Sequence, residues 1–147
     1  MSIYRVLQAT NNNVGAVAVG ENMPFGGITR RIQGGNECCN TFNLTTSGAD
    51  TIVINECGNY NVVYNASLEA GAAGDLSIAL NINGTAVYTS TVTATEGGTA
   101  NVTIPYQIRV RPNCTGFPFN VPANITIVLG GVAVTGGTSN VLVERVY

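Results

Sequence analysis

The sequence contains no lysine and no histidine, and charged residues make up only 10% of its 147 residues. A typical globular domain has roughly 25% charged residues. The only cations are six arginines, which are Arg5, Arg30, Arg31, Arg109, Arg111 and Arg145. With a net charge of −2, the chain lacks the clustered cations from which a phosphate-binding surface gains its affinity. We therefore expect no nucleic-acid partner.

The absence of histidine and lysine also argues against catalysis. Nucleophilic catalysis by Ser, Thr or Cys needs an adjacent base, and the common bases are missing. The eight carboxylates are scattered. A glycosidase pair such as Asp75 with Glu96 would have to meet in space, and solvated turn residues are the favoured interpretation. The Gly-rich turns do not open helices, as phosphate-binding loops do. We expect a protein that is not an enzyme and needs no cofactor.

Long apolar segments are absent as well. The longest apolar run, from Ile125 to Val134, is interrupted by Thr126, Gly130 and Gly131. It is far shorter than the ~20 residues that span a bilayer. The first residues do not combine a charged stretch with an apolar one, so we predict no secretory signal. We expect synthesis in a cytoplasm and no membrane insertion.

The four cysteines are Cys38, Cys39, Cys57 and Cys114. The adjacent pair does not match the Cys-x-x-Cys spacing of a zinc site. Without histidine, a zinc site would have to be all-thiolate. Buried free thiols and disulfides remain as alternatives. In the disulfide alternative, Cys57 and Cys114 would each pair with one of the adjacent cysteines. Asp50 and Asp75 are only weak hints of a calcium site, so we predict no metal.

The dominant period of the sequence is two. Between Asp75 and Ile82, apolar residues at every second position alternate with small or polar ones, which is the pattern of a half-buried strand. Asn83-Gly84 follows, and this dipeptide favours a type I′ turn because both central positions need positive φ. The return strand runs to about Thr93. A two-residue loop would pair Ile82 with Thr85, Leu80 with Val87, and Ile78 with Thr89.

The same alternation predicts further strands between Gly-rich turns. They cover residues 14–19, 24–32, 41–44, 51–54, 60–69, 101–110, 124–129 and 141–147. Pro105 cannot donate to a strand ladder, so it indicates a bulge or an edge strand. The last strand is apolar on both faces, which predicts a central strand that is covered twice. Nine or ten short strands without a helical period indicate an all-β sandwich or barrel.

Residues 58–64 read Gly-Asn-Tyr-Asn-Val-Val-Tyr. This segment resembles the Pro-Gly-x-Tyr-x-aromatic corner that opens a central strand in the globular-head domain of the complement and tumour-necrosis-factor superfamily. Cys57 stands where the family usually has proline. The later Asn-Gly hairpin, the Asn-Met-Pro-Phe step at 22–25 and the closing segment 139–147 resemble family features in the same order. The resemblance covers about residues 14–147.

This resemblance implies a ten-strand jelly-roll sandwich that packs as a homotrimer. Residues 14–147 would form the domain, and residues 1–13 would form an attachment segment with contact candidates Ile3, Tyr4, Val6 and Leu7. Outward-facing residues of the longer strands would line the trimer axis. The candidates are Val63, Asn65, Tyr106, Val143 and Tyr147. Packing within the core is the alternative for each of them. A strand that is apolar on both faces favours assembly independently, because one sandwich covers only one face.

The start of the chain, the Cys38-Cys39 pair and residues 109–114 resemble small proteins of phages and Clostridia-type bacteria. This implies a structural protein of a virion surface, either a capsid decoration or a head fibre. Its partners would be capsid or other particle proteins and a host-surface glycan. One alternative is a subunit of an appendage filament on a bacterial or spore surface. Another is a soluble carbohydrate- or receptor-binding module.

Overall fold

The computed structural model describes residues 5–32, 42–44, 49–110 and 123–146. Among them there is no helix that could cross a membrane. The strands are β1 (Arg5–Asn11), β2 (Gly27–Ile32), β3 (Phe42–Leu44), β4 (Ile52–Ile54), β5 (Gly58–Ala70), β6 (Gly74–Ile82), β7 (Thr85–Ala94), β8 (Thr99–Val110), β9 (Ala123–Gly130) and β10 (Val134–Arg145).

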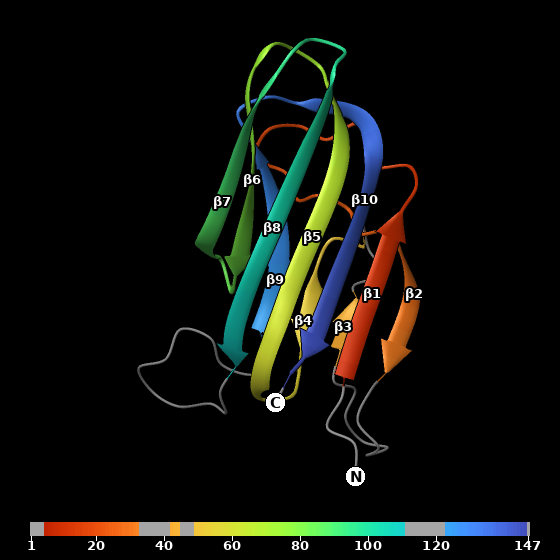
Figure 1. The fold of residues 1–147 in the computed structure, drawn as a ribbon, viewed down its shortest axis with the longest axis vertical. Helices are drawn as coiled ribbons and strands as arrows, with labels where there is room; N and C mark the ends of the chain where they lie inside the picture. Colours follow the sequence, from red (N-terminus) through yellow and green to blue (C-terminus); the bar gives the residue numbers. More distant parts are fainter. Residues whose placement is uncertain (1–4, 33–41, 45–48, 111–122, 147) are drawn as a thin grey trace.

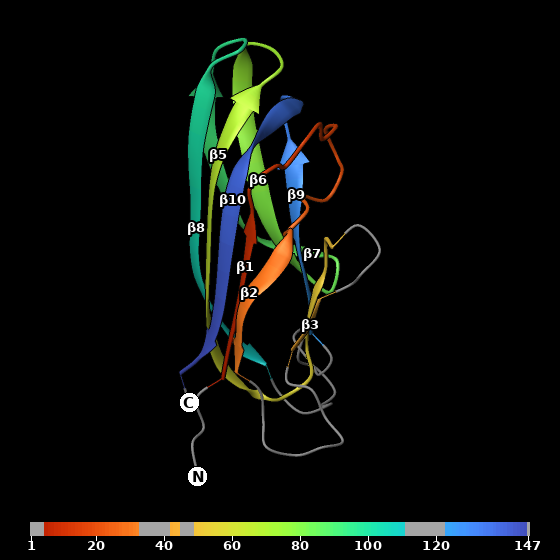
Figure 2. The ribbon, with the colours of Figure 1, turned by 90° about the vertical axis from the view of Figure 1, so that its right-hand side faces the viewer.

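The strands form two five-stranded antiparallel sheets. Sheet A has the order β2-β1-β10-β5-β8, and sheet B has the order β3-β4-β9-β6-β7. In Figure 1 the strands of sheet A lie in front of β9 and β6, and Figure 2 shows the two layers from the side. The predicted all-β jelly-roll sandwich is confirmed. The central position of β10 and the edge position of β8, the strand that carries Pro105, are confirmed as well.

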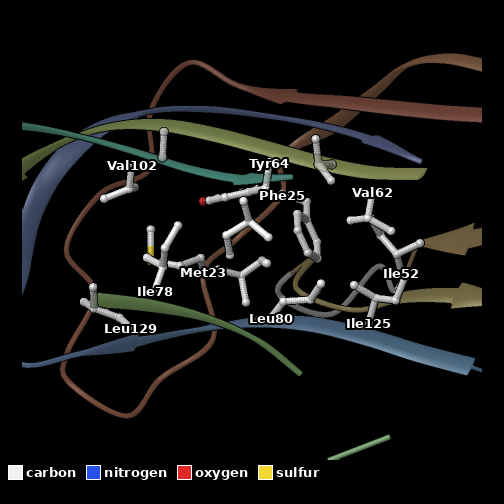
Figure 3. Close-up of a cluster of buried hydrophobic side chains, with 14 of the residues drawn as sticks. Met23, Phe25, Ile52, Val62, Tyr64, Ile78, Leu80, Val102, Ile125 and Leu129 are labelled. Carbon is white, nitrogen blue, oxygen red and sulfur yellow. The ribbon is translucent and has the colours of Figure 1, made fainter. Parts of the chain in front are cut away.

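The inner faces of the two sheets form one hydrophobic core. On β6 the alternating residues are fully buried, as are most of those on β5. Figure 3 shows Tyr64, Met23, Ile78 and Leu80 filling the space between the layers. Full burial of one such aliphatic side chain stabilises the fold by about 1.5–3 kcal/mol. The ring of Phe25 meets Tyr64 edge-on, with 6.2 Å between centroids. The core is therefore built by the period-two pattern of the sequence.

The β6–β7 hairpin confirms the predicted turn but corrects its register. Asn83 and Gly84 have φ values of 51° and 83°, as a type I′ turn requires. Ile82 is opposite Thr85 as predicted. The register then shifts between Leu80 and Asn81, so that Leu80 is opposite Tyr88. The predicted pairs Leu80–Val87 and Ile78–Thr89 are wrong, because a bulge adds one residue to β7.

The N-terminal strand corrects the predicted domain boundary. β1 lies between β2 and β10 in sheet A and pairs with β10 along its whole length. Leu7 and Ala9 belong to the core and are fully buried. Residues 5–11 are therefore part of the jelly roll, and the assignment of residues 1–13 to a separate attachment segment is wrong for this stretch.

Residues 14–23 do not form the predicted strand at 14–19 but cross from one sheet to the other. Val17 makes an isolated bridge with Val134 of β10, and Asn22 makes one with Val128 of β9. Between these bridges the backbone leaves sheet A, and just after the second one Met23 N–H donates to Ile127 O of β9 at 2.6 Å. Val17 and Met23 are buried in the core. This crossing segment closes one side of the sandwich.

Candidate assembly interface

The outer face of sheet A carries a row of apolar side chains. Leu142 on β10 is opposite Val63 on β5, and Val63 is opposite Pro105 on β8. Successive strand residues point to opposite faces, and the neighbours Val62, Val141 and Val143 point into the core. In the single chain Leu142 and Val63 are half-buried and Pro105 is exposed. We call Leu142, Val63 and Pro105 the apolar row.

A second row lies one pleat away and is uncharged but polar. It consists of Thr10, Asn140, Asn65 and Thr103, which are opposite one another on β1, β10, β5 and β8. We call it the amide row. Thr10 Oγ1 donates to Asn140 Oδ1 at 3.0 Å, and Thr103 Oγ1 donates to Asn65 Oδ1 at 2.9 Å. These cross-strand bonds hold the amides in fixed orientations.

Neither row contains a charged side chain. The next row of the outer face carries a charge, because Glu144 is opposite Asn61, and Asn61 is opposite Gln107. Arg30 on the edge strand β2 is opposite Gln8, which is itself opposite Leu142. Removing a charged group from water costs several kcal/mol unless it is paired. Because the apolar row and the amide row contain no charge, another protein surface can cover them without this cost.

A depression of about 490 Å³ borders the amide row. Its walls are uncharged and include Asn65, Asn101 and Asn140 together with Thr and Ser side chains. The depression is large enough to hold several waters, and the amide and hydroxyl groups in its lining can bind them. It therefore leaves room for bridging water when another surface approaches the sheet.

The edge formed by β7 and β8 exposes a second apolar group. Tyr88 is 37% exposed and is one of the few large exposed hydrophobic residues in the described part of the chain. Its ring centroid lies 6.0 Å from that of Tyr106 on β8. Tyr106 is half-buried and packs against the core. This contact holds Tyr88 in place at the open edge of the sandwich.

The structure places the five predicted trimer residues differently. Val63 and Asn65 lie on the outer face of sheet A, and their contact with another copy stays a prediction. Val143 is fully buried in the core, so its predicted outward orientation is wrong. Tyr106 faces the inner side of the sandwich, so its outward orientation is wrong too. Tyr147 lies outside the described residues.

Sequence reasoning missed Leu142 and Tyr88. Leu142 and Val143 are adjacent and both apolar, so alternation alone did not decide which one faces outward. Tyr88 follows the bulge in β7. The Asn83-Gly84 turn gives no sign of this bulge, so the sequence did not show that Tyr88 is opposite Leu80.

The attachment candidates are placed only in part. Val6 and Leu7 are fully buried in β1, so neither is available to bind another particle protein, and both predictions are wrong. Ile3 and Tyr4 lie outside the described residues.

The cysteine prediction is also covered only in part. Cys57 is an exposed free thiol, which is not the bonded state that the disulfide alternative predicted. Cys38, Cys39 and Cys114 lie outside the described residues, so pairing among them stays a prediction. Within the described ranges, no group of three or more Cys, Asp and Glu side chains is arranged to hold a metal ion.

An ionic cluster ties the corner before β5 to the sheet. Glu56 accepts from Arg5 Nε at 3.4 Å and pairs with Arg145 Nη1. Arg5 and Arg145 are opposite each other on β1 and β10. Tyr60 Oη donates to the Glu56 carbonyl oxygen at 2.6 Å. The cluster fastens this end of sheet A.

Burial keeps two core phenols protonated. It raises the pKa of Tyr64 to about 12, and the nearby Ser139 hydroxyl opposes this rise. Burial, followed by the Glu56 charge, raises the pKa of Tyr60, while Arg145 and Arg5 oppose the rise. Both phenols are neutral at physiological pH and pack in the core, and the Tyr60 hydroxyl also donates a hydrogen bond.

Two five-stranded sheets in this strand order define a jelly roll of the tumour-necrosis-factor and C1q type. No protein-family model matches the chain, and no curated protein matches it in sequence. The fold is similar to the globular domain of the zebrafish complement 1qA protein (TM-score 0.68, 11% identity, 97% of both chains).

It is also similar to the Eiger TNF from S. frugiperda (TM-score 0.69, 6% identity, 99% of this chain and 92% of that one). Another similar structure is the vertex protein P5 of the phage PRD1 (TM-score 0.63, 13% identity, 97% of both chains). At these identities the likeness establishes the fold, which the sequence motifs had predicted.

Proposed function

We propose that the chain is a non-enzymatic structural module that assembles as a homotrimer on the surface of a phage virion, as a capsid decoration or a head fibre. The observation that carries the proposal is the pair of uncharged rows in the middle of the outer face of sheet A, one of which is apolar. The jelly roll that this chain shares with a phage vertex protein, over 97% of both chains, supports a virion setting. Its partners would be further copies of itself and other proteins of the particle.

The apolar row supports self-assembly because burial of apolar surface is the main favourable term in association. Leu142 and Val63 occupy the middle of sheet A, where they leave apolar surface that another copy could bury. Charged side chains are depleted at the cores of protein interfaces, and both rows follow that rule. This face therefore has the composition of an interface.

A closed ring of three copies needs two different surfaces on each copy, because head-to-tail contacts close only when one patch fits another. Tyr88 offers the second surface. It contacts Tyr106, which follows Pro105 on β8, so Tyr88 lies close to the height of the apolar row. Rotation about an axis parallel to the strands preserves height. Tyr88 of one copy would therefore pack on Val63 and Leu142 of the next.

Substitution of Val63 by Glu tests the assembly. Burying the unpaired carboxylate would cost about 3–5 kcal/mol, so we expect trimers in the wild type and monomers in the variant. Sedimentation velocity measures both masses. Thr89→Glu is the matched control, because Thr89 is exposed on the outer face of sheet B and should leave the trimer intact. A monomeric wild type would refute the homotrimer.

A cysteine pair tests the head-to-tail arrangement. In a chain whose four cysteines are replaced by serine, Tyr88→Cys with Val63→Cys should give covalent trimers on oxidation, seen on a non-reducing gel. Thr89→Cys with Val63→Cys should give none. Covalent dimers alone would indicate a two-fold contact and contradict the ring.

The virion setting is tested on particles. We expect mass spectrometry of purified virions from the producing culture to detect the chain, and antibody labelling to place it on the particle surface. Detection only in filaments on the cell or spore surface would favour the appendage alternative and reject the proposed setting.

A further inference from the structure

The two asparagine side chains of the amide row are oriented by hydrogen bonds to their oxygens. Both Gln8 Nε2 and Thr10 Oγ1 donate to Asn140 Oδ1, at 3.2 and 3.0 Å. Thr103 Oγ1 occupies Asn65 Oδ1. A side-chain amide has one oxygen and two N–H donors. Because the oxygens are engaged within the sheet, the Nδ2 groups of Asn65 and Asn140 remain for a partner or water. No acceptor for either nitrogen lies in the part of the chain that the structure describes.

These Nδ2 donors limit which surfaces can cover the outer face of sheet A without a loss of binding free energy. A buried polar group left without a partner costs about 1–3 kcal/mol. Asn65 and Asn140 are directly opposite each other, so a surface that covers one covers both. An arrangement that supplies acceptors, or leaves the neighbouring depression hydrated, avoids the cost. An arrangement that packs apolar surface against both amides and excludes water leaves two donors unpaired, and each of them adds this cost.

The apolar row imposes no such restriction. Apolar burial is non-directional and depends mainly on area, so Leu142 and Val63 can be covered at several heights and by different numbers of copies. In coiled coils, a single buried Asn fixes the register and the number of strands at a cost in stability. The outer face of sheet A combines the same two elements.

We propose that Asn65 and Asn140 determine how many copies assemble and at which height they meet, while the apolar row supplies the adhesion. This inference rests on the proposed function, because it requires a second copy to cover the outer face of sheet A. The depression beside the amides holds the waters that bridge their Nδ2 groups to the neighbouring copy. The two asparagines are thus the specificity-determining residues of the assembly.

The test is Asn65→Leu with Asn140→Leu, examined by native mass spectrometry and sedimentation velocity. We expect one trimeric species in the wild type. In the double variant we expect species of other sizes to increase at least about tenfold, which corresponds to a loss of 1.4 kcal/mol of discrimination. A double variant that remains a single trimeric species would overturn the inference.

Two further variants keep the result interpretable. Thr89→Leu with Thr91→Leu adds apolar area to the outer face of sheet B, where both threonines are exposed. It should remain trimeric, and a mixture of sizes there would overturn the inference by showing general stickiness. Asn65→Ala with Asn140→Ala removes the donors without added bulk and should also broaden the size distribution.

A monomeric wild type would instead reject the proposed function. The wild type therefore tests whether the chain assembles, and the asparagine variants test whether these residues determine the size of the assembly.

Discussion

The two faces of sheet A are built from the same strands but follow different rules. On β5 the inward side chains Tyr60, Val62 and Tyr64 are fully buried, whereas their outward neighbours are amides and one valine. The inner face is closed by sheet B and needs only apolar volume. The two central rows of the outer face contain no charge, and the amides there are held in cross-strand bonds. Periodicity therefore identifies a core, whereas the residues between the core positions carry the information about partners.

The largest difference between the two faces, measured as unfolding free energy, should come from Leu68→Ala on the inner side of β5. Leu68 is fully buried, and removal of a buried leucine side chain costs about 2–5 kcal/mol of unfolding free energy. Urea unfolding followed by circular dichroism measures the change. Its neighbour Ser67 faces outward, and Ser67→Ala should stay within about 0.5 kcal/mol of the wild type. Equal losses for the two variants would contradict the division between the faces.

The second-largest effect should come from alkaline pH, which should lower the stability of the fold through the phenols buried on the inner face. The pKa of Tyr64 is about 12 in the fold against 10.0 unperturbed, so the folded state holds this proton more tightly. Stability is complete below pH 10 and falls as the pH rises towards 12, by about 3 kcal/mol for this residue. Urea midpoints between pH 8 and 12 measure the loss.

Tyr64→Phe should make that decline shallower, although Tyr60 contributes in the same direction. A wild-type midpoint that stays constant from pH 9 to 12 would show that these phenols are not desolvated.

The smallest effect should come from the end of the sheet, which belongs to neither face. Glu56→Gln removes the carboxylate that bridges Arg5 and Arg145. Because all three side chains retain contact with water, we expect a loss of about 1 kcal/mol or less. The difference from the wild type should shrink in high salt, which screens exposed charges. A loss as large as that of Leu68→Ala would mean that this corner is as important as the core.

Sequence reasoning recovered the elements in which one residue type alternates with another. The core residues of β5, β6 and β9 and the Asn83-Gly84 turn followed from local pattern. β1 was missed because Val6 and Leu7 are adjacent and both buried, so the strand shows no clean alternation. Residues 14–19 looked like a strand, but they cross between sheets and bond to two different strands in turn.

The candidate site was harder to predict because it depends on register. The apolar and amide rows exist only because β1, β10, β5 and β8 align Gln8 with Leu142, and Val63 with Pro105. These strands lie far apart in the sequence, and no local pattern fixes their relative height. The outward orientation of Val63 followed from alternation, whereas that of Leu142 required the paired neighbours.

β2 is the outermost strand of sheet A next to β1, and all six of its residues are exposed. An uncovered strand edge is a template on which another chain can extend the sheet. Arg30 and Arg31, the only adjacent cations of the sequence, sit on this strand. A second molecule that approached with its own β2 would bring four positive charges together. This repulsion opposes edge-to-edge pairing of two β2 strands, so the sheet does not extend from one molecule into the next. Copies at high concentration therefore contact one another through other surfaces.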